Sequence, residues 1–506
     1  MISTLAFPRV AARLDGSALT EEDAGALEEV RVQQRLSAPS LCELTFINPK
    51  GPLAGSGPRI EGSSLLVEVE GNADPLFVGE VTAAEYTYHP SQGVEVRVRA
   101  YDLLHRLRKR QPVRAHVEVT LSELAHELVA DLGISVEAAE AGPLWPRLIQ
   151  HRQSDLGLLV EIAERCGLYL ALRDRVLHLI TLEGTGEPIP LELGHSLLEA
   201  RLEVNGDPAC RSVLASGWDP WRVERHEGRA RTARVGREVA AEVSPARMGG
   251  TGERSLTNVN AQSDSQAEAF AQAELDARLA REVTLWGVAE GDPRLRPGTR
   301  VKIEGVADQL SGTYVLTSVT HTIERAKGFV SEISSVPPAP RDHARGASAT
   351  LGIVTRIDDP ARLGRVRVSL PALGDVETDW MGVLAAAGGS GKGLVALPEV
   401  ADQVLVLLVG EDPAQGIVLG GLYGTNSPPD WGVEGGAVQR YEFLTRGGQR
   451  LRFDDSRKLV RIENSDGSYI EMSPQKARLH SQVDLEIEAP GRAVVLRGST
   501  VDFQKA

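Results

Sequence analysis

Two short motifs resemble sites that bind a metal or a phosphate, and each is incomplete. His126-Glu127 begins like the His-Glu-x-x-His motif of zinc proteases, in which two histidines one helical turn apart bind the metal, but position 130 is Ala. Gly391-Lys392 resembles the end of a phosphate-binding loop, yet Ala386 and Gly393 stand where that loop needs Gly and Ser or Thr. An amphipathic capped helix accounts better for the first motif, and no strand–loop–helix pattern surrounds the second.

Two pairs of adjacent carboxylates are the remaining candidates for acid–base or metal chemistry. Asp358-Asp359 and Asp454-Asp455 each lie in a turn signal, where Asp side chains accept hydrogen bonds from the backbone. The sequence contains no Gly-x-Ser-x-Gly motif, and its 11 His residues form no cluster with the spacing of metal ligands. We therefore expect no catalytic residue, no metal site, no cofactor and no enzymatic activity.

The composition limits the class of protein. A chain of 506 residues exceeds what one hydrophobic core usually supports, so roughly three or four domains are expected. The net charge of −15 argues against a general nucleic-acid-binding protein, which needs a basic face. Cys42, Cys166 and Cys210 are few and far apart, which suits a reducing cytoplasm. The start lacks a signal-peptide pattern and no apolar run approaches the ~20 residues of a membrane span, so we expect synthesis in the cytoplasm without a signal peptide.

The stretch from Gly352 to Gly424 alternates short apolar runs with turn residues. Five or six short strands within about 75 residues, with no helical pattern among them, are typical of a small closed β-barrel. The strands expected there are Val354–Ile357, Val366–Leu370, Leu394–Leu397, Val404–Val409 and Ile417–Leu419.

The chain before this barrel mixes strands and helices. Val94, Val96 and Val98 alternate with charged residues, which predicts a strand with one buried face. The basic cluster Arg106–Arg110 is interpreted as a solvated strand end. The Arg-rich region 222–256 is interpreted as a solvated strand pair or outer loop, with a docking surface for neighbouring subunits of an assembly as the alternative.

Three capping signals predict helices in the same part of the chain. Thr120 and Glu123 form a capping box ahead of a periodic apolar run, and Ser154 precedes a second such run. A third helix is expected to begin after Ser265, where Glu268 completes a similar signal.

From about residue 441 the apolar residues recur at a spacing near eight, with turn residues between them. Such a short repeat indicates stacked strands, and a single stack leaves its apolar face uncovered. Burying that face contributes roughly 20 kcal/mol gross per chain as an upper value, so we expect three chains wound about one axis to cover it. The residues expected in the core of this three-chain assembly are Leu451, Phe453, Val460, Ile462, Ile470, Met472, Leu479, Val483, Leu485, Ile487, Val495, Val501 and Phe503.

Residues 352–424 contain, in order, Gly-Ile-Val, Asp-Asp-Pro, Gly-Arg-Val-Arg-Val, Trp-Met, Leu-Pro, Gly-Glu-Asp-Pro and Val-Leu-Gly-Gly-Leu-Tyr. This order resembles the OB-fold domain of the VgrG family, the spike proteins of type VI secretion systems, which have relatives in contractile phage tails and extracellular contractile injection systems. Two places depart from the family pattern: Ala401 stands where Gly is usual, and Gly424 stands where Asn is usual. The stretch from His151 to Tyr169 and the Gly-Asp-Pro run at Gly291 resemble the hub of the same family.

The resemblance implies a mainly β protein with some α structure: tube-like β-barrel hub domains with an inserted α/β subdomain, an OB-fold barrel, and a C-terminal intertwined triple-stranded β-helix. The expected divisions are a first hub barrel at 1–112, an inserted α/β subdomain at 113–196, a second hub barrel at 197–336, a linker at 337–348, the OB-fold domain at 349–425, a joint at 426–440 and the β-helix needle at 441–506.

The resemblance also implies a function. The chain would form a homotrimeric hub and spike at the tip of the inner tube of a contractile injection system, adapting a hexameric tube to a threefold needle that punctures the target envelope and helps to deliver cargo. The implied partners are the hexameric inner tube protein, baseplate subunits, a PAAR-like tip protein, cargo effectors and the target membrane or envelope, but no nucleic acid. The particle would be assembled in the cytoplasm and act outside the cell or in the target envelope.

Two alternatives stay open at this point. One is a spike that itself hydrolyses peptidoglycan, and the other is a free receptor-binding or carbohydrate-binding trimer. The joint near 425–440 is too short to contain an enzyme domain, and the repeat runs to Phe503, three residues from the end. Both observations favour a mechanical spike, and the compact length favours an extracellular or phage-tail-like system over type VI secretion.

Overall fold

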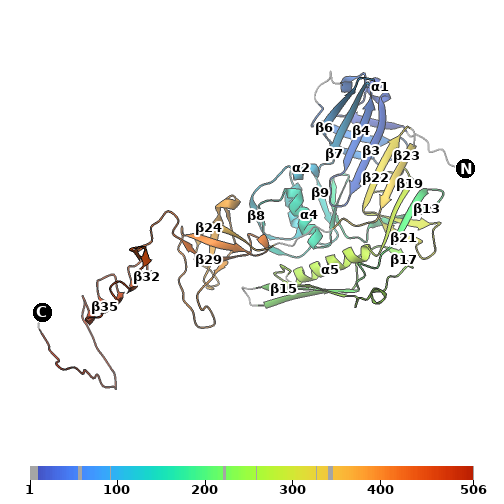
Figure 1. Ribbon diagram of the computed structural model, residues 1–506. Helices are drawn as coiled ribbons and strands as arrows, with labels where there is room; N and C mark the ends of the chain where they lie inside the picture. Colours follow the sequence, from blue (N-terminus) through green and yellow to red (C-terminus); the bar gives the residue numbers. More distant parts are fainter. Residues whose placement is uncertain are drawn as a thin grey trace. The chain divides into compact units, whose positions relative to one another are not determined.

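The structure is a computed structural model that describes residues 9–54, 60–91, 93–219, 224–257, 259–325, 328–339 and 346–504. The chain divides into two units, Met1–Gly420 and Gly421–Ala506, which we describe separately. Strands make up 44% of the chain and helices 12%, so the protein is mainly β, as expected (Figure 1).

The N-terminal part of the first unit is a curved antiparallel sheet around an aliphatic core. Val96 and Val98 lie in that core with no more than 1% of their surface exposed, so the predicted alternation is confirmed. The elements are β1 (Val10–Leu14), β2 (Ser17–Ala18), α1 (Glu21–Gly25), β3 (Leu27–Arg35), β4 (Leu41–Ile47), β5 (Ser64–Val69), β6 (Phe77–His89) and β7 (Gly93–Tyr101).

An α/β segment follows, and local capping signals fix its helices. Thr120 Oγ1 accepts from the backbone N–H of Glu123 at 3.3 Å, and the Glu123 carboxylate accepts from the Thr120 N–H at 2.9 Å, so the predicted capping box is confirmed. Ser154 caps the next helix, also as predicted. The elements are α2 (His105–Arg108), β8 (Arg114–Val119), α3 (Leu121–Val129), β9 (Ser135–Ala138), β10 (Trp145–Gln150), α4 (Asp155–Arg165), β11 (Tyr169–Arg173) and β12 (Val176–Ile180).

The basic cluster Arg106–Arg110 was interpreted as a solvated strand end: Arg106, Arg108 and Lys109 are exposed as expected, but the strand assignment was wrong. His105–Arg108 form the short helix α2, and two of the basic side chains are paired: Arg106 contacts Glu80, and Arg110 contacts Asp131 at 2.7 Å. The partners lie 26 and 21 residues away in sequence, so the local charge run gave no signal of them.

The next part adds a second set of strands and the longest helix. Its helix starts two residues earlier than predicted, because the cap is Ser263 and the Gln266 side chain accepts from the Gln262 N–H at 2.8 Å. The elements are β13 (Thr185–Glu192), β14 (Leu197–Val204), β15 (Ser212–Asp219), β16 (Glu224–Ala230), β17 (Glu238–Val239), β18 (Glu253–Thr257), α5 (Asp264–Ala280), β19 (Val283–Glu290), β20 (Thr299–Glu304), β21 (Gly312–Val315), β22 (Ser318–Glu324) and β23 (Gly328–Ser334).

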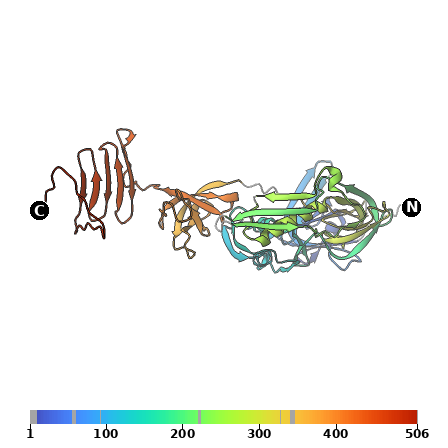
Figure 2. The same cartoon turned by 90° about the horizontal axis from the view of Figure 1, so that it is seen from below.

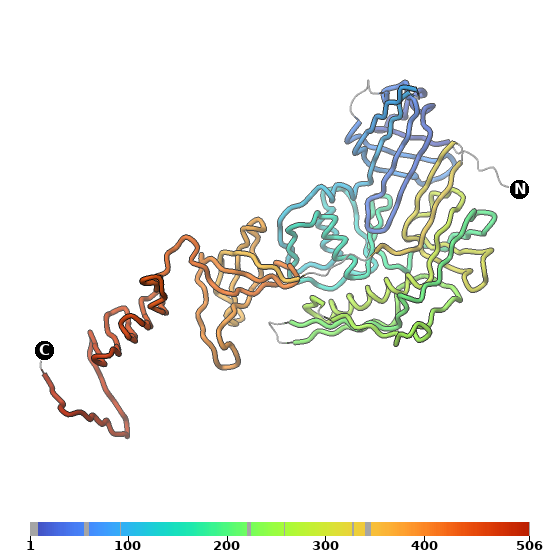
Figure 3. Tube along the Cα trace, in the orientation of Figure 1, coloured from blue at the N-terminus to red at the C-terminus, as the bar shows by residue number. Residues whose placement is uncertain are grey.

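One sheet runs through both sets of hub strands. Its order is β14-β19-β23-β22-β3-β4-β7-β6-β5-β1-β2, and β22 pairs with β3 from Ser318 opposite Arg35 to Glu324 opposite Glu29 (Figure 3). Ile323 and Phe329 from the late strands are buried in the core of the early ones. The two hub parts are therefore continuous through hydrogen-bonded strands.

The burial of His321 in β22 is expected to make the stability of the hub sensitive to acid. Its ring is 1% exposed, Nε2 lies 3.0 Å from the Leu295 carbonyl oxygen and Nδ1 lies 2.9 Å from Ser331 Oγ. A neutral imidazole satisfies both contacts by donating from Nε2 and accepting at Nδ1. Burial lowers the pKa of His321 to about 4.

The unfolded chain binds a proton at His321 more readily than the folded chain does. The contribution of neutral His321 to the free energy of unfolding is therefore complete above pH ~6.5 and is lost as the pH falls towards 4. We expect His321→Gln to remove about 3 kcal/mol of the stability difference between pH 7 and pH 4. Urea unfolding of the wild type and the variant at both pH values measures this difference in the free energy of unfolding. The matched control is His126→Gln, whose ring is exposed on α3 and whose loss should change the free energy of unfolding at pH 7 by no more than about 0.5 kcal/mol.

Residues 346–422 form a closed barrel. The order β24-β28-β29-β27-β25-β26 is closed by an additional β24–β25 pairing, which confirms the predicted barrel. Leu394–Leu397 was wrongly predicted as a strand: these residues lie in an exposed loop, and β27 at Met381–Val383 takes that place in the sheet. The strands are β24 (Ser348–Arg356), β25 (Arg365–Leu370), β26 (Val376–Glu377), β27 (Met381–Val383), β28 (Gln403–Leu408) and β29 (Gly416–Leu422).

The second unit is an antiparallel sheet in which each strand pairs with the next (Figure 2). A small hairpin, β30 (Val433–Glu434) and β31 (Ala437–Val438), precedes it. Its strands are β32 (Arg440–Leu444), β33 (Arg450–Asp454), β34 (Leu459–Glu463), β35 (Tyr469–Met472) and β36 (Ala477–His480). In the described residues after His480, up to 504, no further strand forms, although the repeat predicted strands as far as Phe503.

Candidate functional site

The tail sheet has one aliphatic and aromatic face, and that face lacks cover within its own unit. Two rows of side chains run across the paired strands: Tyr441, Phe453, Val460, Met472 and Ala477 form one row, and Phe443, Leu451, Ile462, Ile470 and Leu479 form the other. Ile462 is 53% exposed, Ile470 49% and Leu479 55%, which is unusual for aliphatic residues in the middle of a sheet. We call this set of ten residues the tail face.

The tail face contains seven of the residues predicted for the needle core. The second row and Leu485 line an apolar groove of about 450 Å³. The other predicted residues lie beyond the last strand and are exposed: Val483 66%, Ile487 64%, Val495 64%, Val501 55% and Phe503 87%. The sequence analysis missed three members of the tail face: Ala477, and Tyr441 and Phe443, whose alternation just before Leu451 is the signal that could have found them.

The opposite face of the tail sheet is a network of ion pairs. Arg440 contacts Asp430 at 2.6 Å, Arg452 contacts Glu442 at 2.6 Å, and Arg461 contacts Glu471 at 3.1 Å. Arg440 and the Gly432 N–H hold the pKa of Asp430 at about 2. The charges on this face are satisfied locally, so the tail face is the side that needs a partner.

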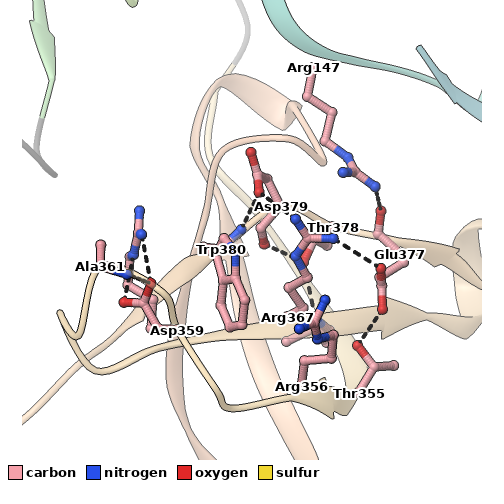
Figure 4. Close-up of polar contacts among 12 residues, drawn as sticks. Arg147, Thr355, Arg356, Asp359, Ala361, Arg367, Glu377, Thr378, Asp379 and Trp380 are labelled. Carbon is pink, nitrogen blue, oxygen red and sulfur yellow. Dashed lines mark hydrogen bonds and ion pairs between the residues drawn. The ribbon is translucent and has the colours of Figure 1, made fainter. Parts of the chain in front are cut away.

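The barrel of the first unit also has a charged outer surface, which meets the α/β segment (Figure 4). Arg147 from β10 donates through Nη2 to the Glu377 carbonyl oxygen at 2.7 Å, and the Glu377 carboxylate accepts from Thr355 Oγ1 at 2.7 Å. The Arg356 and Arg367 guanidiniums lie 5.6 and 5.2 Å from the Trp380 ring centroid. Ile149, two residues after Arg147, is buried in the barrel core, so β10 joins the hub to the barrel.

The motifs that were considered for chemistry have structural roles. His126 contacts the Ser122 carbonyl oxygen on α3 at 2.8 Å, and Lys392 lies in the exposed loop. Asp359 accepts from the Ala361 and Leu363 N–H groups and pairs with Arg365, which lowers its pKa. Asp454 similarly accepts from Ser456 and the Arg457 N–H. Within the described part of the chain, His, Cys, Asp and Glu form no group that could hold a metal ion.

The Arg-rich region was interpreted as solvated, and this was wrong for two of its members. Arg234 contacts Asp276 at 2.8 Å and Glu140 at 2.7 Å and donates to the Cys166 carbonyl oxygen, and Arg237 donates to the Leu279 carbonyl oxygen. Arg225, Arg229 and Arg231 are exposed as expected, whereas Arg222 lies outside the described residues.

Helices that could cross a membrane were sought among the described residues, and none is long and apolar enough. A search of curated proteins found no match.

Several solved structures have a similar fold. One is an Escherichia coli component of the type VI secretion system, itself described as similar to the bacteriophage T4 tail proteins gp27 and gp5: it is 12% identical, with a TM-score of 0.51 over 82% of this chain and 99% of that chain. Another is the lidless PdpA-VgrG complex, 9% identical, with a TM-score of 0.55 over 94% of this chain and 99% of that chain; a half-lidded form of the complex from Francisella gives 0.56 over 94% and 88%. At these identities the likeness establishes the fold, which is that of a VgrG-like hub.

Two family models match the sequence. Residues 350–423 match the type VI secretion system/phage-baseplate injector OB domain, which covers the closed barrel. Residues 63–325 match the Alg8 N-terminal domain, which covers more than half of the chain and most of the continuous hub sheet. The chain therefore belongs to the family defined by the Alg8 N-terminal domain and carries the injector OB domain after it.

Proposed function

We propose that three copies of this chain form the hub and spike at the tip of the inner tube of a contractile injection system. The tail face is the main observation that supports this proposal. Eight of the ten side chains of the tail face are exposed and the other two are partly exposed, while the charged residues of the opposite face are paired with one another. A free-standing sheet would instead bury its apolar face. Three copies around one axis would bury these faces against one another and produce the intertwined β-helix needle.

The fold of the hub supports the proposal that this chain lies at the tip of an inner tube. VgrG-like hubs share this arrangement of sheet, α/β segment and OB barrel. In the assembled particle the hub would adapt a hexameric inner tube protein to the threefold needle, with baseplate subunits around it and a PAAR-like protein on the tip. The needle would concentrate the force of sheath contraction on the target envelope and help to deliver cargo. Work of this kind requires no bond cleavage, so we propose a structural protein and no enzyme.

Light scattering on the purified chain tests the proposal. We expect a mass three times that of the 54.4 kDa chain, because the tail face is covered only in an assembly. A well-behaved monomer at micromolar concentration would contradict both the needle and the hub-and-spike function. Zymography on peptidoglycan with the same sample tests the enzymatic alternative, for which clearing around the pure protein would be decisive.

A further inference from the structure

Strand β10 takes part in two hydrophobic cores. Leu148 is buried in the core of the α/β segment, whereas its neighbour Ile149 is buried in the core of the barrel, with 5% of its surface exposed. Successive side chains of a strand point to opposite faces, so the two cores lie on opposite faces of β10. Ala115 of β8 lies directly opposite Ile149 in the strand pair and also packs against the barrel core.

Polar contacts tie β10 to two separate parts of the barrel. Arg147 donates through Nη2 to the Glu377 carbonyl oxygen of β26 at 2.7 Å (Figure 4). Arg152, which follows β10, contacts Glu411 in the turn after β28 at 3.3 Å. Because the Arg152 side chain is largely exposed, that ion pair contributes little energy, and the main contacts of β10 with the barrel are those of Arg147 and Ile149.

Gly374 of the barrel lies against the residue that precedes β8. Its φ of 72° is in the left-handed region, and a Cβ added there would lie 3.2 Å from Val113 Cγ2. A side chain at position 374 would therefore strain its own backbone and crowd the hub. The barrel thus approaches the β8–β10 strand pair closely at a further point.

The covalent connection alone does not fix the orientation of the barrel. The chain passes from the hub to the barrel once, through residues 335–347 between β23 and β24. Such a connection limits how far two domains can separate, but they move relative to one another unless a packed apolar interface prevents it. The shared strand β10 supplies that interface here, because its two neighbouring residues Leu148 and Ile149 are buried in different cores.

We infer that β8 and β10 hold the barrel rigidly on the hub and transmit the force of contraction from one to the other. This inference rests on the proposed function, in which the hub pushes the needle against the resistance of the envelope. The connection between hub and barrel is then loaded in compression. A connecting segment of chain slackens under such a load, whereas packed side chains resist it, so β10 is the path of the force.

Distances between two spin labels on the full chain test the inference. Cys42, Cys166 and Cys210 are all buried, so the labels attach to introduced Cys residues. One label is placed on the hub at Arg229→Cys, on the exposed side of β16, and the other on the barrel at Leu351→Cys, which is 43% exposed on β24. Co-production with a large excess of the wild-type chain, and labelling after assembly, restrict the measured distances to those within one chain.

The test variant carries Arg147→Met and Ile149→Ala, which remove the polar and the apolar contact of β10 with the barrel. The matched control carries Arg175→Met and Ile134→Ala. Arg175 likewise donates to backbone carbonyl oxygens and Ile134 is likewise buried, but both contacts lie within the α/β segment. If circular dichroism shows that the test variant does not fold, Arg147→Glu replaces it, because that change places a negative charge beside Asp379.

We expect a narrow distance distribution in the wild-type background and in the control, and one at least about twice as wide in the test variant, because the barrel is then held only by the connecting segment. A test variant as narrow as the control would overturn the inference, and so would a wild-type background as broad as the test variant. Light scattering on the same samples tests the proposed function separately. A monomeric wild-type chain would contradict that function, whereas the widths would still decide whether β10 holds the barrel on the hub.

Discussion

Replacing Ile470 with Asp is expected to convert the trimer into monomers at micromolar concentration. Ile470 lies in the middle of the tail face, between Ile462 and Leu479 in the strand register. In the proposed needle the change would bring three carboxylates into one apolar layer, where each unpaired charge costs several kcal/mol. The hub should keep its secondary structure, because its cores belong to the other unit. Light scattering and far-ultraviolet circular dichroism on one sample measure both effects.

The matched control is Gln475→Asp, which adds the same charge at an exposed turn between β35 and β36. It should remain trimeric, with a stability within about 0.5 kcal/mol of the wild type. Acidification provides a further check: below pH ~4 the introduced Asp is neutral, so the Ile470→Asp chain should recover trimer there. A variant that stays trimeric at neutral pH, or equal effects of the two substitutions, would show that the tail face does not line the needle.

Replacing Arg234 with Met is expected to destabilise the hub strongly. Arg234 joins three segments through Asp276 on α5, Glu140, and the Cys166 carbonyl at the end of α4. The Asp276 side chain is 1% exposed, so the variant leaves a carboxylate buried with less compensation. Breaking a buried ion pair in this way costs about 3 kcal/mol or more. Chemical denaturation monitored by circular dichroism measures the loss.

The stability lost by the Arg234→Met variant should depend on pH. Burial already raises the pKa of Asp276 above its ordinary value, and loss of the guanidinium raises it further. The folded variant then binds a proton more readily than the unfolded chain, so part of the lost stability returns as the pH falls. Arg229→Met on the exposed side of β16 is the control, and it should change stability by no more than about 0.5 kcal/mol. Similar losses in both variants would contradict the role of the buried pair.

The sequence predicted what depends on near neighbours. The Thr120–Glu123 capping box spans three residues, and the apolar run Val404–Val409 lies within one segment, so the cap was predicted correctly and the strand, observed as Gln403–Leu408, within one residue. The helix α5 was misplaced by two residues because Ser263 and Ser265 are both suitable caps, and the Gln266 contact decides between them. The Ser263-to-Gln266 spacing was itself a capping signal that could have been used.

What depends on distant partners could not be predicted. Leu394–Leu397 has the composition of a strand but no neighbouring strand to pair with, and the shorter Met381–Val383 pairs with both β25 and β29. Arg234 meets an Asp 42 residues away, which no local pattern indicates. For the tail, the repeat located the apolar residues, but strands after His480 require backbone partners that the single chain does not provide.

The pairing of β3 with β22 also affects how the protein folds during synthesis. The ribosome releases β3 long before it makes β22, with about 280 residues between the two strands. At roughly 5–20 residues per second, the edge of β3 waits about 15–60 s for its neighbour. Val30 and Val32 alternate along that edge, and the core around them lacks Ile323 and Phe329 for the same period. During synthesis the hub sheet is therefore incomplete, and the unpaired edge of β3 is prone to aggregation. The sheet is completed only when β22, which is synthesised later, pairs with β3.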